Sequence, residues 1–313
     1  MAHEIEQMAY AGETPWHGLG NKVSNDLSPR EMAKAAGCNW SVDRVPAFIE
    51  HHGRRIPTGV SALVRNTDLK ILDTVSDDWE PCQNQEAFDF FSKFVEAGDM
   101  EMHTAGSLKG GKIVWAMAKV KRSFTINKKD QIDANLLFTN PHMYGKAIDV
   151  RFTPVRVVCN NTLTMALEKK GDLIVRQHHR QKFDPTLALD AIEAASERMN
   201  TYKATAEFLS SKRYNDETLM NFYKTVFGEK SGSTETVKSL PRAGQMALDV
   251  IGSQPGHEMA AGSWWQAFNS VTYTVDHLIG HNRDTALTSS WFGVNRDKKM
   301  LALAKSVEFA RAA

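Results

Sequence analysis

Cysteine is scarce in this chain, with three residues among 313, at Cys38, Cys82 and Cys159. Their odd number, wide spacing and lack of a CxxC pair argue against a disulfide framework and favour a reducing compartment. No apolar run reaches about 18 residues, which argues against a transmembrane helix. The first residues lack a cationic segment followed by an apolar one, so we expect no secretory signal and a cytoplasmic location.

Motifs for nucleophilic and metal chemistry are also missing from the sequence. There is no GxSxG motif and no clustered DxD pattern of the kind that two-metal nucleases use. His277 and His281 are spaced to share a helix face, but Leu278 stands where a zinc protease has its glutamate. The sequence therefore predicts no metal ion and no cofactor, and it favours a protein without catalytic activity.

Net charge is close to zero, at +1, but the charges are unevenly distributed. Residues 105–182 hold 15 of the 38 basic residues and only 5 of the 37 acids, which makes this stretch about +10. The remainder of the chain is correspondingly acidic. A basic block of this kind is typical of proteins that bind a polyanion, because each cation near a phosphate releases a counterion. The alternative is that these charges are spread over several faces and only solvate the surface.

The order of hydrophobic patterns predicts an α+β fold with an antiparallel β-sheet core, strands-then-helix units and a helical C-terminal region. Residues 40–76 and 105–156 read mainly as strands, whereas residues after 184 have the periodicity of helices. We accordingly expect an α+β nucleic-acid-binding core over residues 1–184. A helical region, residues 185–313, is expected to pack on that core.

Several local signals add detail to this expectation. Ser28, Pro29 and Gly37 bound a short helix, and residues 84–97 and 159–171 are each expected to form a helix. The glycine-rich segment GSLKGG, residues 106–111, lacks the spacing of a phosphate-binding loop and is expected to be a hairpin turn. The polar stretch 228–244 is the best candidate for a linker.

The basic block supplies the candidate site residues for nucleic acid. Basic side chains interleaved with aromatic rings suit single strands, because cations follow the backbone while rings stack on bases. Trp115 and Phe138 lie in apolar runs and are expected in the core. The predicted nucleic-acid-binding residues are Lys109, Lys112, Lys121, Arg122, Phe124, Lys128, Lys129, Tyr144, Lys146, Arg151 and Arg156.

Five segments together resemble a known family. They are MAHEIE at 1–6, TPWHGLG at 14–20, AGSLKGGKIVWAMAKV at 105–120, PVRVVCNNTLTMAL at 154–167 and WWQAFNSVTYTVDH at 264–277. In these the chain resembles the phage/plasmid-like domain-of-unknown-function family 932, which implies a protein of a mobile element in a bacterial cytoplasm. More remotely, the order of elements resembles phage single-strand annealing proteins. That resemblance implies a ring or filament that binds and anneals single-stranded DNA in recombination, without touching a membrane.

Two other classes of function stay open at this point. An enzyme acting on nucleic acid or nucleotides would use the basic block as a platform, with His142, Asp149, His178 or His179 in catalysis. An interaction protein of a mobile element would instead block a host factor. DNA-versus-RNA preference and oligomeric state are not fixed by the sequence.

Overall fold

The fold is described from a computed structural model of the chain. The described residues are all except 1–3, 13–14, 16–17, 157, 159–160, 167, 170–171, 174–175, 185, 229–239, 280–284 and 313. Trp16, His17, Cys159 and His281, and most of the expected linker, therefore lie outside the described residues. No helix among those described combines the length and hydropathy that crossing a membrane requires.

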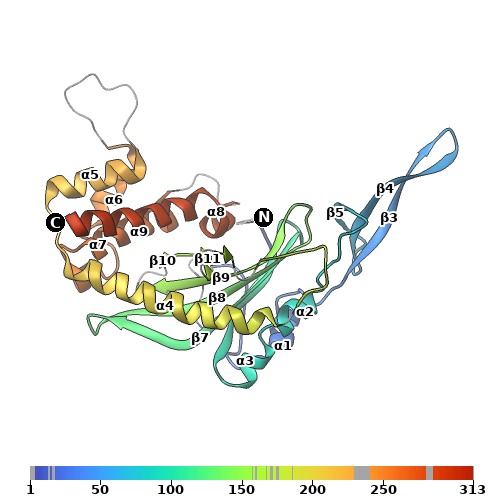
Figure 1. Cartoon of the computed structure of the whole chain (residues 1–313), viewed down its shortest axis with the longest axis horizontal. Coiled ribbons are helices and arrows are strands. Elements are labelled where there is room, and N and C mark those ends of the chain that lie inside the picture. The colour runs from blue at the N-terminus through green and yellow to red at the C-terminus, as the bar shows by residue number, and fades with distance from the viewer. Residues whose placement is uncertain are drawn as a thin grey trace. The chain divides into compact units, whose positions relative to one another are not determined.

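A nine-stranded, largely antiparallel sheet forms the core predicted from the sequence (Figure 1). Its main path runs in the order β10-β9-β8-β7-β6-β1-β2, and β11 and β14 also pair with β9. The only parallel pair among the described registers is β1 with β2. The strands are β1 (Ile5–Ala11), β2 (Asn21–Val23), β6 (Met100–Leu108), β7 (Ile113–Ile126), β8 (Asp130–Pro141), β9 (Ala147–Arg156), β10 (Asn161–Thr162), β11 (Met165–Ala166) and β14 (Arg176–His178). A separate two-stranded sheet pairs β12 (Glu168–Lys169) with β13 (Asp172–Leu173).

Strand β7 is buried on both faces over its first half, as its apolar run predicts. Every residue from Val114 to Ala118 is buried, and Trp115 is 1% exposed. Because successive side chains of a strand point to opposite faces, both faces of the sheet are covered here. The expectation that Trp115 and Phe138 belong to the core is confirmed.

A three-stranded sheet carries a long hairpin (Figure 1). It consists of β3 (Val42–His51), β4 (Arg54–Arg65) and β5 (Ile71–Ser76), paired in that order. His52 and Gly53 close the hairpin with φ of 50° and 70°, which is the geometry of a type I′ turn. Pairing between β3 and β4 continues to His51↔Arg54 at the tip.

Helices make up the rest of the described chain. Ser28 caps α1 reciprocally with Glu31, and Pro29 is its first residue, as the sequence predicts. The helices are α1 (Pro29–Ala35), α2 (Asn84–Asp89), α3 (Ser92–Glu96), α4 (Leu187–Ser211), α5 (Asp216–Phe227), α6 (Arg242–Val250), the 3-10 helix η2 (His257–Ala260), α7 (Trp264–Tyr273), the π-helix η3 (Thr274–Leu278), α8 (Ala286–Phe292) and α9 (Val294–Ala312).

Two helix predictions need correction. The helix expected over 84–97 is interrupted at Phe90 and Phe91, which separate α2 from α3. The helix expected over 159–171 is wrong, because its described residues form short strands. Asn161 and Thr162 pair with Arg156 and Val155 of β9, so sheet pairing overrides the helical pattern of this segment.

The chain divides into two compact units that do not follow the expected boundary at residue 184. Unit 1 comprises residues 1–121, 135–152 and 166–195, and unit 2 comprises 122–134, 153–165 and 196–313. Strands β7, β8 and β9 thus contribute residues to both units. The core of unit 2 includes the rings of Phe222, Trp264 and Phe309, with centroids 5.5–6.1 Å apart.

Candidate nucleic-acid interface

Three turns of unit 1 meet at one end of its strands. The backbone N–H of His142 donates to the carbonyl of Lys112 at 2.8 Å, which joins the β8–β9 turn to the β6–β7 turn. The Tyr144 N–H donates to the Asp73 carboxylate of β5 at 2.9 Å. The ammonium of Lys70 lies so close to Gly110 that a Cβ there would overlap it. We call this region the end surface, and it comprises Leu69, Lys70, Ile71, Lys109, Lys112, Tyr144 and Lys146.

The end surface combines cations with one exposed ring and two exposed aliphatic side chains. Tyr144 is 64% exposed, Leu69 76% and Ile71 61%. Lys70, Lys109 and Lys146 are exposed and Lys112 is half-buried. Tyr144 and three lysines were predicted from the sequence, and this geometry brings them together. An exposed ring on a surface that also carries ammonium groups can stack on a base while the cations contact phosphates.

Acidic side chains also lie in this region, and one arginine engages two of them, Glu6 and Asp68. Arg65 donates to both carboxylate oxygens of Glu6, at 2.9 and 3.0 Å, and to both of Asp68, at 2.9 and 2.6 Å. The hydrogen bond from Arg65 lowers the pKa of Asp68 to about 2. Burial opposes ionisation of Glu6, yet Arg65 outweighs it and the pKa of Glu6 is lowered. Both carboxylates are therefore charged and engaged at neutral pH.

The lysines of the end surface are held far more loosely than Arg65. Lys109 lies 3.8 Å from Glu4 and Lys70 lies 3.9 Å from Glu6, and about two fifths of each lysine side chain is exposed. Lys112 and Lys146 have no acidic partner among the described residues. Contacts of this length between exposed groups contribute little, so a phosphate can compete for these ammonium groups.

The KGG sequence of the β6–β7 turn is required by its backbone. Lys109, Gly110 and Gly111 have φ of 55°, 65° and 89°, a left-handed run that favours glycine. A Cβ on Gly111 would also lie 2.7 Å from Nη1 of Arg65. The segment is therefore a hairpin turn, as predicted, and its tightness lets Lys70 and Arg65 approach the backbone.

Other predicted residues lie away from the end surface. Lys128 and Lys129 are exposed at the β7–β8 turn, which is at the opposite end of strand β7 from Lys112. Lys121 is exposed late in β7, where its N–H donates to the Asp99 carbonyl. The Arg122 side chain lies outside the described part of the structure. The β7–β8 turn belongs to unit 2, whereas the end surface belongs to unit 1.

Two predicted contacts are wrong because the side chains are buried. Arg156 is 4% exposed and pairs with Asp130 at 2.8 Å, while it also donates to the Gly256 carbonyl at 3.0 Å. Asp130 additionally accepts from the Trp265 indole at 2.8 Å. Phe124 is buried, with its ring centroid 6.2 Å from that of Tyr202. Neither side chain is available to a phosphate or a base.

Arg151 is half-buried and donates to the carboxylate of Asp149 from both Nε and Nη2. The pair lies two residues apart on one strand, so the two side chains point to the same face. Arg151 was predicted to bind a phosphate and Asp149 to act in catalysis. Each is instead engaged by the other, which reduces the charge that either presents to a ligand.

The histidines considered for catalysis are mostly structural. His142 is fully buried, its Nε2 lies 2.9 Å from the Asn84 amide oxygen, and burial lowers its pKa to about 3. His179 stacks on Trp79 with centroids 4.1 Å apart, and burial lowers its pKa to about 4. His178 is exposed. Both buried imidazoles are neutral at physiological pH and packed away from solvent.

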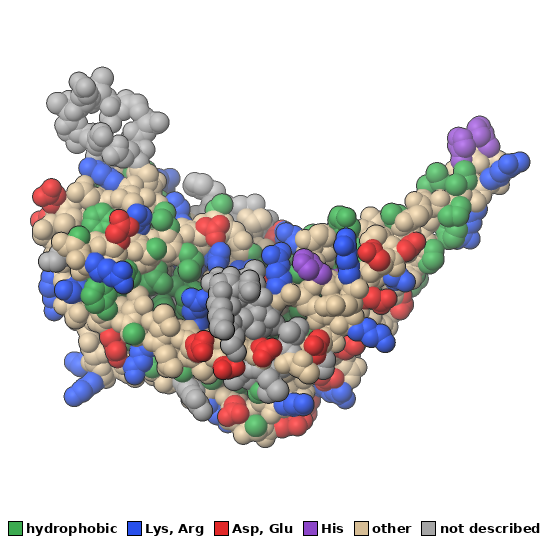
Figure 2. Space-filling model, in the orientation of Figure 1, with side chains coloured by type: hydrophobic (Ala, Val, Ile, Leu, Met, Phe, Trp, Pro, Cys, Tyr) green, Lys and Arg blue, Asp and Glu red, His purple; other side chains and the backbone are tan. Residues whose placement is uncertain are grey.

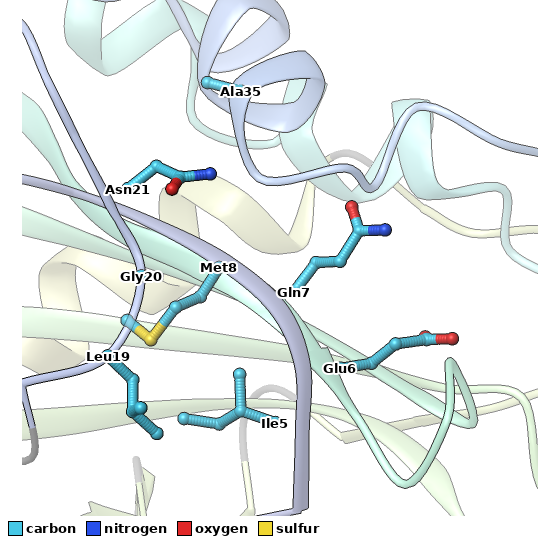
Figure 3. Close-up of a pocket in the computed structure, with 8 residues that line it drawn as sticks. All are labelled: Ile5, Glu6, Gln7, Met8, Leu19, Gly20, Asn21 and Ala35. Carbon is cyan, nitrogen blue, oxygen red and sulfur yellow. The ribbon is translucent and has the colours of Figure 1, made fainter. Parts of the chain in front are cut away.

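A cavity of about 400 Å³ lies between β1, the segment before β2, and α1 (Figure 3). Its lining includes Met8, Leu19 and Ile5, and the side chain of Glu6 is its only acid. Since Glu6 is bound by Arg65, the cavity offers no acid–base pair. No group of three or more potential metal ligands occurs among the residues that the structure describes.

Sequence reasoning missed Leu69, Lys70 and Ile71. Asn66 and Asp68 are residues typical of turns, but nothing in the sequence indicates that Lys70 would lie beside Gly110, forty residues later. The one sequence feature that could have indicated this site is a lysine between two aliphatic residues, directly after a turn.

Comparison with known proteins gives one match. The family model described as Domain of unknown function (DUF932) matches residues 71–305. No curated protein and no solved structure matches the chain. The matched region includes the lysines of the β6–β7 and β8–β9 turns and most of the helices after residue 184. Since the match covers three quarters of the sequence, this chain belongs to the DUF932 family.

Proposed function

We propose that the protein binds single-stranded DNA with little sequence preference and anneals complementary strands, without catalysis. The observation that carries the proposal is the meeting of the turns that carry the exposed Tyr144 and the lysines Lys70, Lys109, Lys112 and Lys146. Sequence-independent binding of single strands needs cations for the backbone and a ring on which any base can stack. Recombination in a phage or plasmid is the process we propose for this activity.

Annealing is possible because the protein would contact the phosphates of the strand and leave its base edges free. Lysines act on phosphates as point charges and do not read base edges, so the bases stay available to test a second strand. Lys128 and Lys129 supply a second basic position at the β7–β8 turn. Contacts at separate positions on repeated protomers would add through avidity.

The enzyme alternative has less support at the described positions. A general base needs a pKa near the working pH and contact with the substrate. His142 and His179 are buried and have pKa values of about 3 and 4. His178 is the exposed member of the three, and the described residues give it no carboxylate partner to orient it.

The test is binding of a labelled oligo(dT) strand, followed by fluorescence anisotropy over a range of salt. If four lysines each neutralise one phosphate, log affinity falls with log salt at a slope of about −2.8, at roughly −0.7 per phosphate. The K109E/K112E variant should weaken binding and bring the slope towards about −1.4. Tyr144→Ala should reduce the binding free energy for the strand by about 1–3 kcal/mol, the range measured for base–aromatic stacking.

The matched control is K22E/K34E, which reverses two exposed lysines of β2 and α1. It should bind the strand like the wild type. Annealing of complementary labelled strands, with magnesium or manganese added, tests the activity itself. Absent binding at low salt, equal binding by K109E/K112E, or cleavage of the strands would each contradict the proposal.

A further inference from the structure

The hairpin β3–β4 exposes apolar side chains over its outer part, residues 45–60, which we call the arm. Val45, Phe48, Ile49, Ile56 and Val60 are between 39% and 55% exposed. Figure 2 shows hydrophobic side chains along this hairpin, with histidine and basic side chains at its tip. Contiguous exposed apolar surface is a feature of sites that bind another molecule.

The arm is a two-stranded ribbon whose side chains are mostly exposed. Ile49 and Ile56 are paired across the strands, and so are Glu50 and Arg55. The guanidinium of Arg55 lies 4.0 Å above the ring of Phe48. Residues paired across strands share a face, so Ile49 and Ile56 lie on one face of the ribbon. Successive residues of a strand point to opposite faces, so Phe48 lies on the other face. Apolar side chains therefore occur on both faces.

The edges of the arm are poorly suited to pairing with a strand of another protein. Pro46 in β3 and Pro57 in β4 have no N–H to donate. Between the pairs Pro46↔Ser61 and Phe48↔Pro57, β4 advances four residues while β3 advances two, which is a bulge. The hydroxyl of Thr58 donates to the Ala47 carbonyl at 2.8 Å, so that acceptor is already used. Prolines and bulges at an edge are devices that prevent strand addition.

The charge at the tip favours a polyanion. Arg54 and Arg55 are exposed there beside His51 and His52, with Glu50 as the one acid. Two strands about 4.8 Å apart, with their side chains, match the major groove of B-form DNA, which is about 12 Å wide and admits a two-stranded ribbon. The minor groove, about 6 Å wide, is too narrow, and the major groove of A-form RNA is closed to side chains.

We propose that the arm binds in the major groove of B-form duplex DNA. Arg54 and Arg55 contact phosphates, and Ile49 and Ile56 contact base edges, including the methyl group of thymine. This inference rests on the proposed function in one respect, since the duplex would be the product of annealing. The arm would hold that product, whereas the end surface holds the single strand.

The experiment compares binding to a duplex DNA of about 25 base pairs with binding to the RNA duplex of the same sequence. Wild-type protein should prefer the DNA. The R54Q/R55Q variant should lose two phosphate contacts and reduce the salt slope for the duplex by about 1.8, at 0.9 per phosphate. The I49S/I56S variant should weaken binding at fixed salt and leave the slope unchanged. K22Q/K34Q is the control and should match the wild type.

Every variant is also measured with oligo(dT) and by thermal melting. All substituted positions are exposed, so melting temperatures should be unchanged, and the arm variants should bind the single strand normally. Equal duplex binding by R54Q/R55Q and wild type would overturn the inference, as would equal affinity for the RNA duplex. If the arm variants altered the oligomeric mass and left duplex binding unchanged, the arm would be a contact between protein chains, and the inference would be wrong. Arm-dependent duplex binding in a protein that does not bind oligo(dT) would refute the proposed function alone.

Discussion

Three arginines of this chain differ from the lysines of the end surface in how they are held. Arg65, Arg151 and Arg156 each donate to a carboxylate through more than one nitrogen. The planar guanidinium suits such contacts, whereas an ammonium on a flexible stem suits the solvent. A count of basic residues therefore overstates the charge available to a polyanion. The sequence cannot show this, because Arg65 lies 59 residues from Glu6 and Arg156 lies 26 from Asp130.

The buried histidines give the protein an expected sensitivity to acid. Folding lowers the pKa of His142 and His179 below 6.5, so below that pH the unfolded chain binds more protons than the folded one. This contribution to stability is fully present above about pH 6.5. It falls as the pH is lowered to about 4 for His179 and about 3 for His142, by at most about 1.4 kcal/mol per pH unit for each histidine. Chemical denaturation at several pH values measures this slope.

His179→Gln should reduce that slope by the contribution of one proton. The neighbouring His178→Gln, at an exposed position, is the control and should keep the wild-type slope. The comparison concerns the slope alone, because His179→Gln also alters packing against Trp79. A His179→Gln protein with the wild-type slope would show that folding does not lower the pKa of His179.

Elements with strong local signals were predicted well. Ser28 and Pro29 start α1, and the glycines after Lys109 form the turn between β6 and β7. Residues 161–166 were not predicted, because their strands depend on pairing with β9 and not on their own side chains. Tertiary pairing of this kind has no local signature. The approach of Lys70 to Gly110 is likewise a tertiary contact, so the sequence does not predict it.

Two glycines, one in each of two turns, allow a matched comparison. Gly111 of the β6–β7 turn and Gly145 of the β8–β9 turn both have left-handed backbones, with φ of 89° and 71°. A Cβ at Gly145 would meet nothing within 4 Å, whereas one at Gly111 would lie 2.7 Å from Arg65. Gly145→Ala should cost about 1–2 kcal/mol from the backbone alone. Gly111→Ala should cost more in denaturant unfolding, since it also displaces Arg65 from Glu6 and Asp68. Equal losses would contradict this account of the turn.

Self-association is a property of the whole molecule. We expect homo-oligomers, as rings or filaments, because four lysines hold a flexible strand weakly and repetition multiplies such contacts. The main sheet ends in β2 with three residues and β10 with two. Short edge strands offer few unpaired backbone groups. Assembly through pairing at these two edge strands is therefore poorly supported.

Mass photometry with and without oligonucleotide tests this expectation. Species at multiples of the protomer mass, increasing when a single strand is added, should appear at micromolar protein. The K109E/K112E variant should respond less to the strand, while K22E/K34E should respond fully. Protein that stays monomeric in both conditions would argue against annealing by a repeated surface and favour the enzyme or interaction-protein alternatives.

The interleaving of the two units has a consequence for the chain as it leaves the ribosome. All residues of unit 1 have been synthesised once residue 195 is added, whereas unit 2 still lacks residues 196–313. Segments 122–134 and 153–165 belong to unit 2, so they emerge early and wait for the C-terminal helices. Phe124, for example, packs against Tyr202, which is made 78 residues later. Growing chains would therefore hold part of their future core uncovered until translation is nearly complete, and this interval is when a chaperone would be needed most.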